Sequence, residues 1–440
     1  MSLQVPERPV GFLAAWHRLV GARGVPTLPR RWGRPPRVPL TDLLPALTFH
    51  VMHNAGTLAE HFAQLFDDTF ADSSWADRRA RVPWAIFTEL LQRVLRPKAT
   101  RRHPDAFWRG WRLVALDGTQ FSLTNTPQIV ATTRKARTRR GRAAFAKLWT
   151  TVLLEVGLHN PLAAAIGRHD ESEWALAQRL LTHLPRRALL LGDRLYGVAA
   201  FVGPAQAACA RTGSHFLLRA SRSTTPRVIT RLSDGTRRVQ IALRARNSPS
   251  RILEWLEVRE LRVRVGRPGA RAHELRLWTS LLDPATAPAL ELAQLYAQRW
   301  EHELYFRELK RQIRKTDVLQ SHTVETAAQE IAALILVSAL LADERRRAAG
   351  GQLPVLRVSF TKLLELCVKP MWLWADLGRG VLTDRQLTTI LRRGYARMRR
   401  YLTPPPRARS CPRAVRQPIQ AWPRLLHAQS TTGPFDLQLV

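Results

Sequence analysis

The spacing of apolar residues changes three times along the 440 residues, and each change predicts a different kind of structure. Up to about residue 105, apolar residues recur every three or four positions, which is typical of amphipathic helices. From Trp111 onward short apolar runs with strand character take over. Apolar and polar residues then alternate through about 214–284, and helical spacing returns after Pro284. This order predicts an α/β fold that contains an all-β insertion and has helical regions at both ends.

The same changes give the expected domain boundaries. At about 150 residues per domain, the length predicts roughly three folding units. The pattern divides the chain into five consecutive segments: 1–105, 106–213, 214–284, 285–345 and 346–440.

The second segment carries an ordered series of elements. Three strand-like runs, a helix and a fourth strand over 188–191 follow one another along the chain. Asp170 is expected to cap the helix, because Glu173 stands three residues later as in a capping box. Asp234-Gly235, in the third segment, predicts a hairpin turn.

The charge of the chain limits the partners it can have. There are 69 Lys and Arg against 34 Asp and Glu, which leaves a net charge of +35. Such a surface binds polyanions. A membrane-binding chain concentrates its charge on one amphipathic helix, whereas these arginines are spread from end to end. Nucleic acid is therefore the expected partner.

Location and membrane contact follow from simpler features. The apolar run at 331–342 is about 12 residues long, short of the roughly 20 needed to span a bilayer, and predicts a buried helix. The N-terminus lacks the apolar run of a signal peptide, and three scattered cysteines suit a reducing compartment. We expect a cytoplasmic, nucleoid-associated protein without a membrane segment.

Two acids follow apolar strands and are candidates for metal binding. Asp117 stands in VALDGT and Asp193 in LLLGDRLYG, each expected at the exit of a strand. A carboxylate held there at a sheet edge can bind a divalent cation. For either Asp alone, an ordinary turn residue is the more common interpretation.

A third acid stands in a regular helical pattern further along. Four polar residues follow one another at intervals of three, four and seven positions: Tyr296, Arg299, Glu303 and Lys310. On one α-helix, their side chains would fall within an arc of about 60°. A solvated salt-bridge face is the other interpretation of this spacing. Glu301 and Glu308 fall outside the arc and are expected to be surface charges.

At these residues the chain resembles the DDE transposases of bacterial insertion sequences, in particular the fourth insertion-sequence family. Its signature is Y-(2)-R-(3)-E-(6)-K, and YAQRWEHELYFRELK matches it in full, after the LDGT and GDRLYG motifs. The resemblance covers about residues 111–341. It implies a ribonuclease H-like mixed sheet with flanking helices, interrupted by a β-rich insertion between the second Asp and the Glu.

The resemblance also implies roles for these residues. Asp117, Asp193 and Glu303 would be catalytic ligands of two Mg²⁺ ions, with Mn²⁺ as a substitute, and the signature residues Tyr296, Arg299 and Lys310 would contact DNA beside the cleaved phosphate. The activity would be cleavage of element ends and their joining to target DNA by two-metal phosphoryl transfer. The partners would be terminal inverted repeats and target DNA, held by a homodimer on paired ends.

Other segments are candidate DNA contacts. Segment 1–105 is expected to be a helical DNA-binding region. No acid lies between Asp117 and Glu155, and the cations there predict a phosphate-contacting loop, or else a solvated charge run: Arg134, Lys135, Arg137, Arg139, Arg140, Arg142 and Lys147. Eleven arginines and no acid lie between Asp384 and Asp436, in a tail that either wraps DNA or stays disordered.

Aromatic and histidine residues give weaker candidates. Trp278 and Trp255 are candidates to stack on a flipped base, which requires an exposed ring face; core packing is the usual fate of Trp in a strand. His50 and His53 have helical spacing for a metal, but a third ligand is not evident.

Two other functions are compatible with these patterns. One is a catalytically inactive DNA-binding protein derived from a transposase, and the other is a nuclease of the same fold that cuts without joining. The intact acids and signature favour the transposase.

Overall fold

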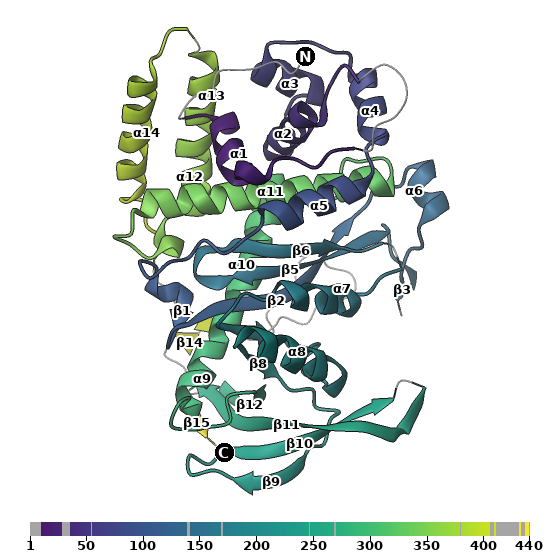
Figure 1. Ribbon diagram of the computed structural model, residues 1–440, viewed down its shortest axis with the longest axis vertical. Coiled ribbons are helices and arrows are strands. Elements are labelled where there is room, and N and C mark those ends of the chain that lie inside the picture. The colour runs from purple at the N-terminus through teal and green to yellow at the C-terminus, as the bar shows by residue number, and fades with distance from the viewer. Residues whose placement is uncertain are drawn as a thin grey trace. The chain divides into compact units, whose positions relative to one another are not determined.

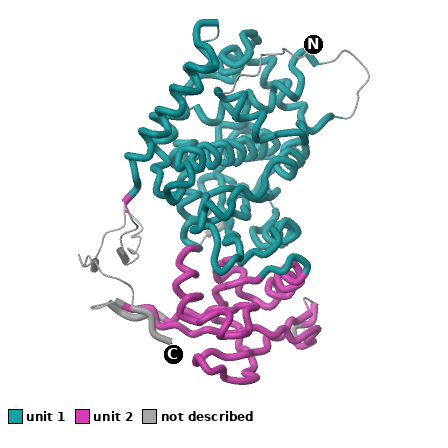
Figure 2. Tube along the Cα trace, turned by 60° about the vertical axis from the view of Figure 1, so that its left-hand side comes forward, with its two compact units in different colours: residues 1–189, 211–214, 299–403 teal, residues 190–210, 215–298, 404–440 magenta. Residues whose placement is uncertain are grey.

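The computed structural model describes residues 10–28, 36–53, 55–138, 141–168, 170–245, 247–267, 270–378, 380–404, 409–410, 431–432 and 436–439. They form two compact units (Figure 2). Unit 1 comprises 1–189, 211–214 and 299–403, and unit 2 comprises 190–210, 215–298 and 404–440. The N-terminal helical region and the C-terminal region up to residue 403 therefore belong to unit 1 together with the strands over 111–166, while Asp193 and the β-rich insertion belong to unit 2.

Unit 1 contains three antiparallel strands of a larger sheet, in the order β6-β5-β2. They are β2 (Trp111–Ser122), β5 (Lys147–Glu155) and β6 (Asn160–Ile166), and the short β1 (Phe107–Trp108) pairs with β2. Most residues of β5 are buried, as expected of a strand covered on both faces. The three predicted strands are thus confirmed.

The expectation that the strand ends at Asp117-Gly118 is wrong, because β2 continues through both residues to Ser122. Asp117 pairs with Val152 and Gly118 with Thr151 in an unbroken ladder with β5. The glycine serves close packing instead of a turn. A Cβ on Gly118 would lie 2.4 Å from Cγ of Glu173, which packs over the strand.

The helix after β6 starts later than predicted. Helix α7 (Glu173–Leu180) has Ser172 as its N-cap, and the Ser172 Oγ accepts a hydrogen bond of 3.3 Å from the Ala175 N–H. The prediction of Asp170 as the cap is wrong, since the serine satisfies a free amide of the first turn.

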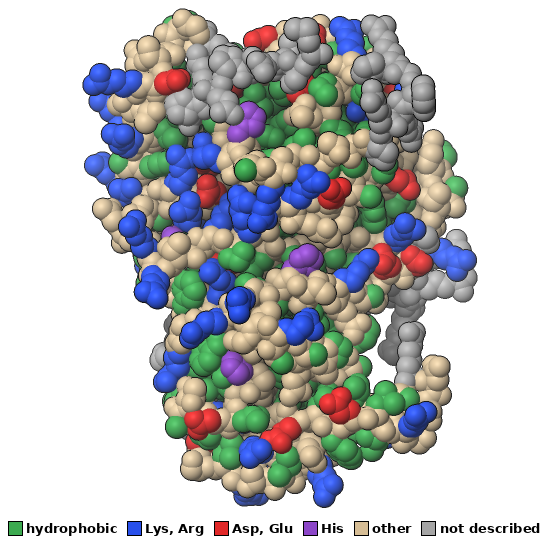
Figure 3. Space-filling view, in the orientation of Figure 1, with side chains coloured by type: hydrophobic (Ala, Val, Ile, Leu, Met, Phe, Trp, Pro, Cys, Tyr) green, Lys and Arg blue, Asp and Glu red, His purple; other side chains and the backbone are tan. Residues whose placement is uncertain are grey.

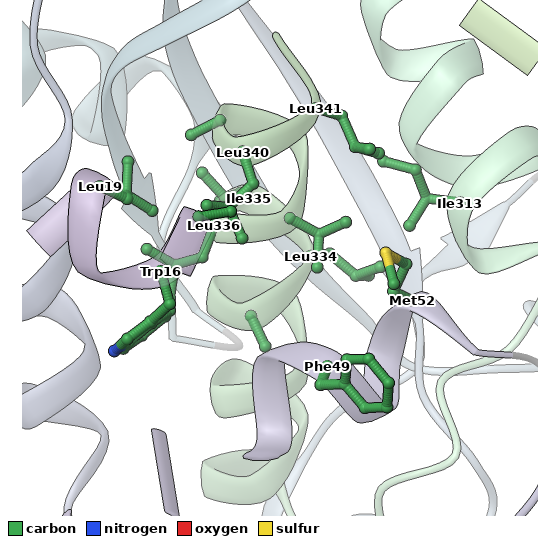
Figure 4. Packing of buried hydrophobic residues seen from close by; sticks show 14 of the residues in the cluster. Trp16, Leu19, Phe49, Met52, Ile313, Leu334, Ile335, Leu336, Leu340 and Leu341 are labelled. Atoms are coloured by element: carbon green, nitrogen blue, oxygen red, sulfur yellow. The ribbon is translucent and has the colours of Figure 1, made fainter. Parts of the chain in front are cut away.

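The helices of unit 1 pack around one long buried helix, α11 (Val324–Ala349), as Figures 1 and 4 show. It contacts α2 (Leu40–Met52), α5 (Trp84–Val94) and β6. Its length and composition would suffice to cross a membrane, but 89% of its most apolar window is buried inside the protein. The predicted buried helix over 331–342 is confirmed.

The other elements of unit 1 are short. Its remaining α-helices are α1 (Phe12–Val20), α3 (Leu58–Phe66), α4 (Asp72–Ala80), α6 (Pro127–Thr132), α10 (Trp300–Arg307), α12 (Phe360–Leu363), α13 (Lys369–Leu377) and α14 (Asp384–Met398). A two-stranded sheet is formed by β3 (Arg137–Thr138) and β4 (Gly141–Arg142).

Unit 2 is built on antiparallel strands in the order β8-β12-β11-β10-β9. They are β8 (His215–Arg219), β9 (Arg227–Arg231), β10 (Arg237–Ala245), β11 (Ser248–Arg267) and β12 (Ala270–Thr279). The hairpin predicted between β9 and β10 is confirmed, with Gly235 at φ 81°. The terminal β15 (Asp436–Leu439) pairs with β11, and β13 (Arg409–Ser410) pairs with β14 (Thr431–Thr432).

Three further elements lead into and out of this sheet. Strand β7 (Ala188–Gly192) matches the predicted strand and runs from unit 1 into unit 2. Helix α8 (Ala199–Thr212) follows it, and α9 (Ala289–Tyr296) comes after β12.

Candidate active site

One guanidinium joins two of the three predicted acids in unit 1. Arg299 Nη2 lies 2.7 Å from Glu303 Oε1, and Arg299 Nη1 lies 3.6 Å from Asp117 Oδ2. The side chains of Asp117 and Glu303 are 15% and 38% exposed, so both carboxylates remain open to solvent. The first acid on β2 and the third on α10 therefore share one small region with the signature arginine.

His302 holds α10 at this position. Its Nε2 lies 2.9 Å from the carbonyl oxygen of Val152, the β5 residue that pairs with Asp117. Burial lowers the pKa of His302 to about 3, so the ring is neutral and its Nε2–H donates to the carbonyl. Because Glu303 is the next residue, this bond holds its part of α10 against β5.

Lys310 reaches the same strand from the π-helical segment η6 (Glu308–Arg314). Its Nζ donates to Thr119 Oγ1 at 2.5 Å and to the Gln120 carbonyl at 2.8 Å. Burial, followed by the positive charge of Arg314, lowers the pKa of Lys310 to about 8. The signature lysine is thus fixed two to three residues beyond Asp117, and about half of it is uncharged near pH 8.

The expectation that Glu308 is a surface charge is wrong. Glu308 is 8% exposed, and its Oε2 lies 2.7 Å from His159 Nδ1 while its Oε1 lies 3.1 Å from Arg345 Nη1. Glu301 Oε2 lies 3.0 Å from the other ring nitrogen of His159. Both acids that fall outside the signature arc therefore fasten the signature segment to His159, at the turn between β5 and β6.

The proton balance of this cluster follows from its pairing. Burial alone would lower the pKa of His159, but Glu308 and Glu301 outweigh it and the pKa lies above 6.5. Burial would raise the pKa of Glu308, yet His159 and Arg345 hold it below 4.5. The two carboxylates therefore favour the charged imidazolium of His159 more than water does for a free histidine.

Asp193 and Tyr296 belong to unit 2. Asp193 directly follows β7, as predicted, and its Oδ1 accepts the Leu195 N–H at 2.7 Å. The Tyr296 hydroxyl donates to the Gly192 carbonyl at 3.2 Å, and the side chain is buried. The signature tyrosine thus supports the end of the strand that carries Asp193.

The expectation of one continuous helix through the signature is wrong. A 3₁₀ turn, η5 (Ala297–Arg299), separates α9 from α10, and η6 is π-helical. These segments advance by different angles per residue than an α-helix. A common arc at 100° per residue therefore does not extend from Tyr296 to Lys310.

The acids of unit 1 offer the donor chemistry of a hard divalent cation. Asp117 and Glu303 present carboxylate oxygens, which Mg²⁺ and Mn²⁺ prefer, and the positive charge between them now comes from Arg299. Within the described part of the chain, no three His, Cys, Asp or Glu side chains are grouped closely enough to hold a metal. His50 and His53 form no such group either; His50 Nδ1 lies 2.8 Å from His61 Nδ1.

The predicted DNA contacts outside the signature have mixed outcomes. Arg139 and Arg140 lie outside the described residues, as does the side chain of Arg137, the first residue of β3. Most of the arginine-rich tail also lies outside them. Basic side chains gather over α14 in Figure 3, where the exposed arginines are Arg385, Arg392, Arg393 and Arg397.

The prediction that Trp278 offers an exposed ring for base stacking is wrong. The residue is fully buried, and its Nε1 donates to Glu260 Oε2 at 3.2 Å. A strand residue that faces the interior has no free ring face. Trp255 on β11 is 44% exposed.

Three residues that support the site were not identified from the sequence. Thr119 had a signal, since it belongs to the LDGT motif, and His302 had a weak one beside Glu303. His159 had none, because its partner Glu308 lies 149 positions away.

Comparisons with known proteins show which proteins this chain is similar to. A family model described as "Transposase DDE domain" matches residues 108–340. The transposase InsG for insertion sequence element IS4 of Escherichia coli K12 is 26% identical over 257 residues, which cover 57% of this chain and 56% of that protein. The chain spans about half the length of the curated relatives it matches. The structure of a piggyBac transposase synaptic complex with hairpin DNA aligns with a TM-score of 0.45 and 8% identity, over 83% of this chain and 79% of that one.

Proposed function

The chain belongs to the transposase DDE domain family, and we propose that it is an insertion-sequence transposase that cuts the ends of its element and joins them to target DNA. The observation that carries the proposal is the meeting of Asp117 and Glu303 at the Arg299 guanidinium. Two acids and a cation on a strand and a helix form a partly exposed site suited to a charged phosphate.

We propose that Asp117, Asp193 and Glu303 hold two Mg²⁺ ions, with Mn²⁺ as a substitute. Such ions activate the attacking hydroxyl and stabilise the leaving oxygen of a phosphodiester. Carboxylates alone repel DNA, so the neighbouring cations have a second task. Arg299, released from the acids, and Lys310 would bind the phosphate next to the cleaved bond.

The remaining parts of the proposal concern partners and location. The net charge of +35 would supply sequence-independent affinity for terminal repeats and target DNA. Coordinated transfer needs both ends held together, so two copies would act on paired ends. We propose a cytoplasmic, nucleoid-associated location on the same grounds.

The test uses a plasmid that carries the gene with its own flanking DNA. Asp117→Asn, Asp193→Asn and Glu303→Gln should each lower Mg²⁺-dependent nicking by at least about a thousandfold, because each removes one ligand charge from the site. Binding of the same DNA in EDTA should persist. Asp170→Asn, the same change at an exposed acid of unit 1, is the control and should nick normally.

The products of this reaction distinguish a transposase from the two alternatives, a nuclease and an inactive DNA-binding protein. Nicks that are never joined to a second DNA would favour a nuclease, and binding without nicking would favour an inactive DNA-binding protein. An undiminished nicking rate in any of the three acid variants would remove that residue from the metal site.

A further inference from the structure

Unit 2 contains a cavity of about 290 Å³ that is lined almost entirely by charged side chains. The volume corresponds to about ten water molecules. The lining residues are Arg194, Arg219, Ala220, Arg222, Arg262, Glu274 and Arg276. Five guanidinium groups stand against one carboxylate in this lining, and an anion bound there would offset the cost of bringing like charges together.

The cavity is assembled by a close backbone contact. The Ser221 N–H donates to the Gly197 carbonyl at 2.8 Å, and a Cβ on Gly197 would lie only 1.8 Å from the Arg219 carbonyl oxygen. Only glycine permits this approach. It brings the loop that follows β7, with Arg194, against the end of β8, which carries Arg219 and leads into Arg222.

A buried acid, Glu260, fixes two of the lining arginines, Arg262 and Arg276. Glu260 is 1% exposed, and its carboxylate pairs with Arg262 Nε at 3.0 Å and with Arg276 Nε at 3.8 Å. Trp278 donates to the same carboxylate, and Arg276 Nη2 also donates to the Thr224 carbonyl at 2.9 Å. These two arginines are therefore held in place before any ligand arrives.

The other three lining arginines have a different environment. Arg194, Arg219 and Arg222 are exposed, and they make no ion pair with any residue that the structure describes. Arg262 and Arg276, in contrast, share Glu260, and Glu274 is the acid in the lining. Arg194, Arg219 and Arg222 thus give the cavity an excess of positive charge.

We infer that this cavity binds a backbone phosphate of the DNA strand that passes Asp193, as a second DNA contact separate from the metal site. The inference rests on the proposed function. Guanidinium forks match phosphate oxygens in geometry and charge, and Arg194 directly follows Asp193 in the chain. A phosphate bound there places its strand beside the second acid.

The lining argues for a phosphodiester over other anions. Ala220 is its one apolar member, so the cavity lacks the apolar contacts that a lipid surface would use. A free phosphate shares the same chemistry, and the experiment separates it from DNA.

The experiment measures the binding of a 30-base-pair duplex by fluorescence anisotropy in EDTA, over a range of salt concentrations. The double variant Arg219→Gln/Arg222→Gln should lower affinity at least about tenfold near 0.1 M salt. It should also reduce the slope of log affinity against log salt by about 0.9 for each phosphate that the variant no longer binds. Arg219→Lys/Arg222→Lys keeps the positive charges but removes the two-pronged guanidinium contacts. Its DNA affinity should lie between those of the unmodified protein and the Gln double variant.

The matched control is Arg227→Gln/Arg231→Gln, which removes the same charge from exposed positions on β9 outside the cavity. It should change affinity less than about threefold, since it alters only the general charge. Equal losses in the two Gln pairs would overturn the inference. Unfolding midpoints checked in parallel should match the unmodified protein, because all four side chains are exposed.

Calorimetry with inorganic phosphate distinguishes the two sources. Phosphate binding that the cavity pair abolishes, together with unchanged DNA affinity, would assign the cavity to a free anion and overturn the DNA assignment. If the unmodified protein binds no DNA, the proposed function fails. If it binds and nicks DNA while the cavity pair behaves like the β9 pair, only this inference fails.

Discussion

His302 Nε2 lies 2.9 Å from the carbonyl oxygen of Val152, the residue directly opposite Asp117 in the β2–β5 ladder. A single hydrogen bond thus ties α10, the helix that carries Glu303, to β5, the strand that pairs with β2 at Asp117. The bond does not touch the acids themselves. It makes His302 a positioning residue for Glu303.

Replacing this residue tests that role. His302→Leu should lower the free energy of unfolding by about 1–2 kcal/mol, since it removes one buried hydrogen bond at similar volume. Nicking should fall further, by at least about tenfold, because a small displacement of a catalytic group is costly. Urea unfolding and plasmid nicking measure the two effects.

His183→Leu is the control for this change, because His183 is exposed and far from the signature in sequence. It should leave nicking unchanged. If His302→Leu lowers nicking only as much as its lost stability lowers the folded fraction, the positioning role is wrong.

The pair of His159 and Glu308 predicts a pH-dependent stability. The pKa of His159 is raised above 6.5, so its contribution is complete below about pH 6.5 and is lost as pH rises through the raised value. The pKa of Glu308 is lowered below 4.5, so its contribution is lost only as pH falls through that lowered value. Stabilisation by the pair is greatest between these limits.

His159→Asn should therefore cost most near pH 5.5 to 6.5, about 3 kcal/mol as for other broken buried pairs, and less at pH 9. Asparagine suits the φ of 51° at this position. Denaturant unfolding at several pH values measures the change, and Glu308→Gln completes a double-mutant cycle. A pH-independent cost would contradict the charged pair.

Lys310 predicts a pH dependence of DNA binding. Its pKa of about 8 means that the side chain is mostly charged at pH 7 and only about one tenth charged at pH 9. DNA affinity of the unmodified protein in EDTA should fall across this range. Lys310→Arg should stay flat and high, and Lys310→Met flat and low. Equal slopes in all three proteins would show that Lys310 makes no charged contact with DNA.

Gly118 predicts a stability effect with a specific rescue. Gly118→Ala places a Cβ about 2.4 Å from Glu173 Cγ, and should cost about 1–3 kcal/mol in the free energy of unfolding. Gly118→Ala/Glu173→Ala should recover most of it. Gly203→Ala, where the nearest atoms would lie at 3.4 Å in a helix, is the control and should be neutral or stabilising. A missing rescue would contradict the packing of Glu173 on β2.

Local patterns were sufficient for most of the elements. The strand over 188–191, the hairpin at Asp234-Gly235 and the buried helix over 331–342 are confirmed, because each depends on apolar spacing or turn chemistry within a short window. The strand exit expected at Asp117-Gly118 failed for the opposite reason, because the strand is extended by its ladder with β5, a segment about 30 residues away. The cap at Asp170 failed for a local reason, because Ser172 two residues later caps α7 instead.

Motif and charge in the chain alone indicated the family, the polyanionic partner and the residues Asp117, Asp193 and Glu303, since residue type and interval are properties of the linear order. The tertiary fold decided which side chains meet. Arg299 lies between Asp117 and Glu303, His159 fastens Glu308, and five arginines from separate strands and loops line one cavity. Hydrogen bonds and ion pairs act over a few ångströms, and residues a hundred or more positions apart come that close only when the chain has folded.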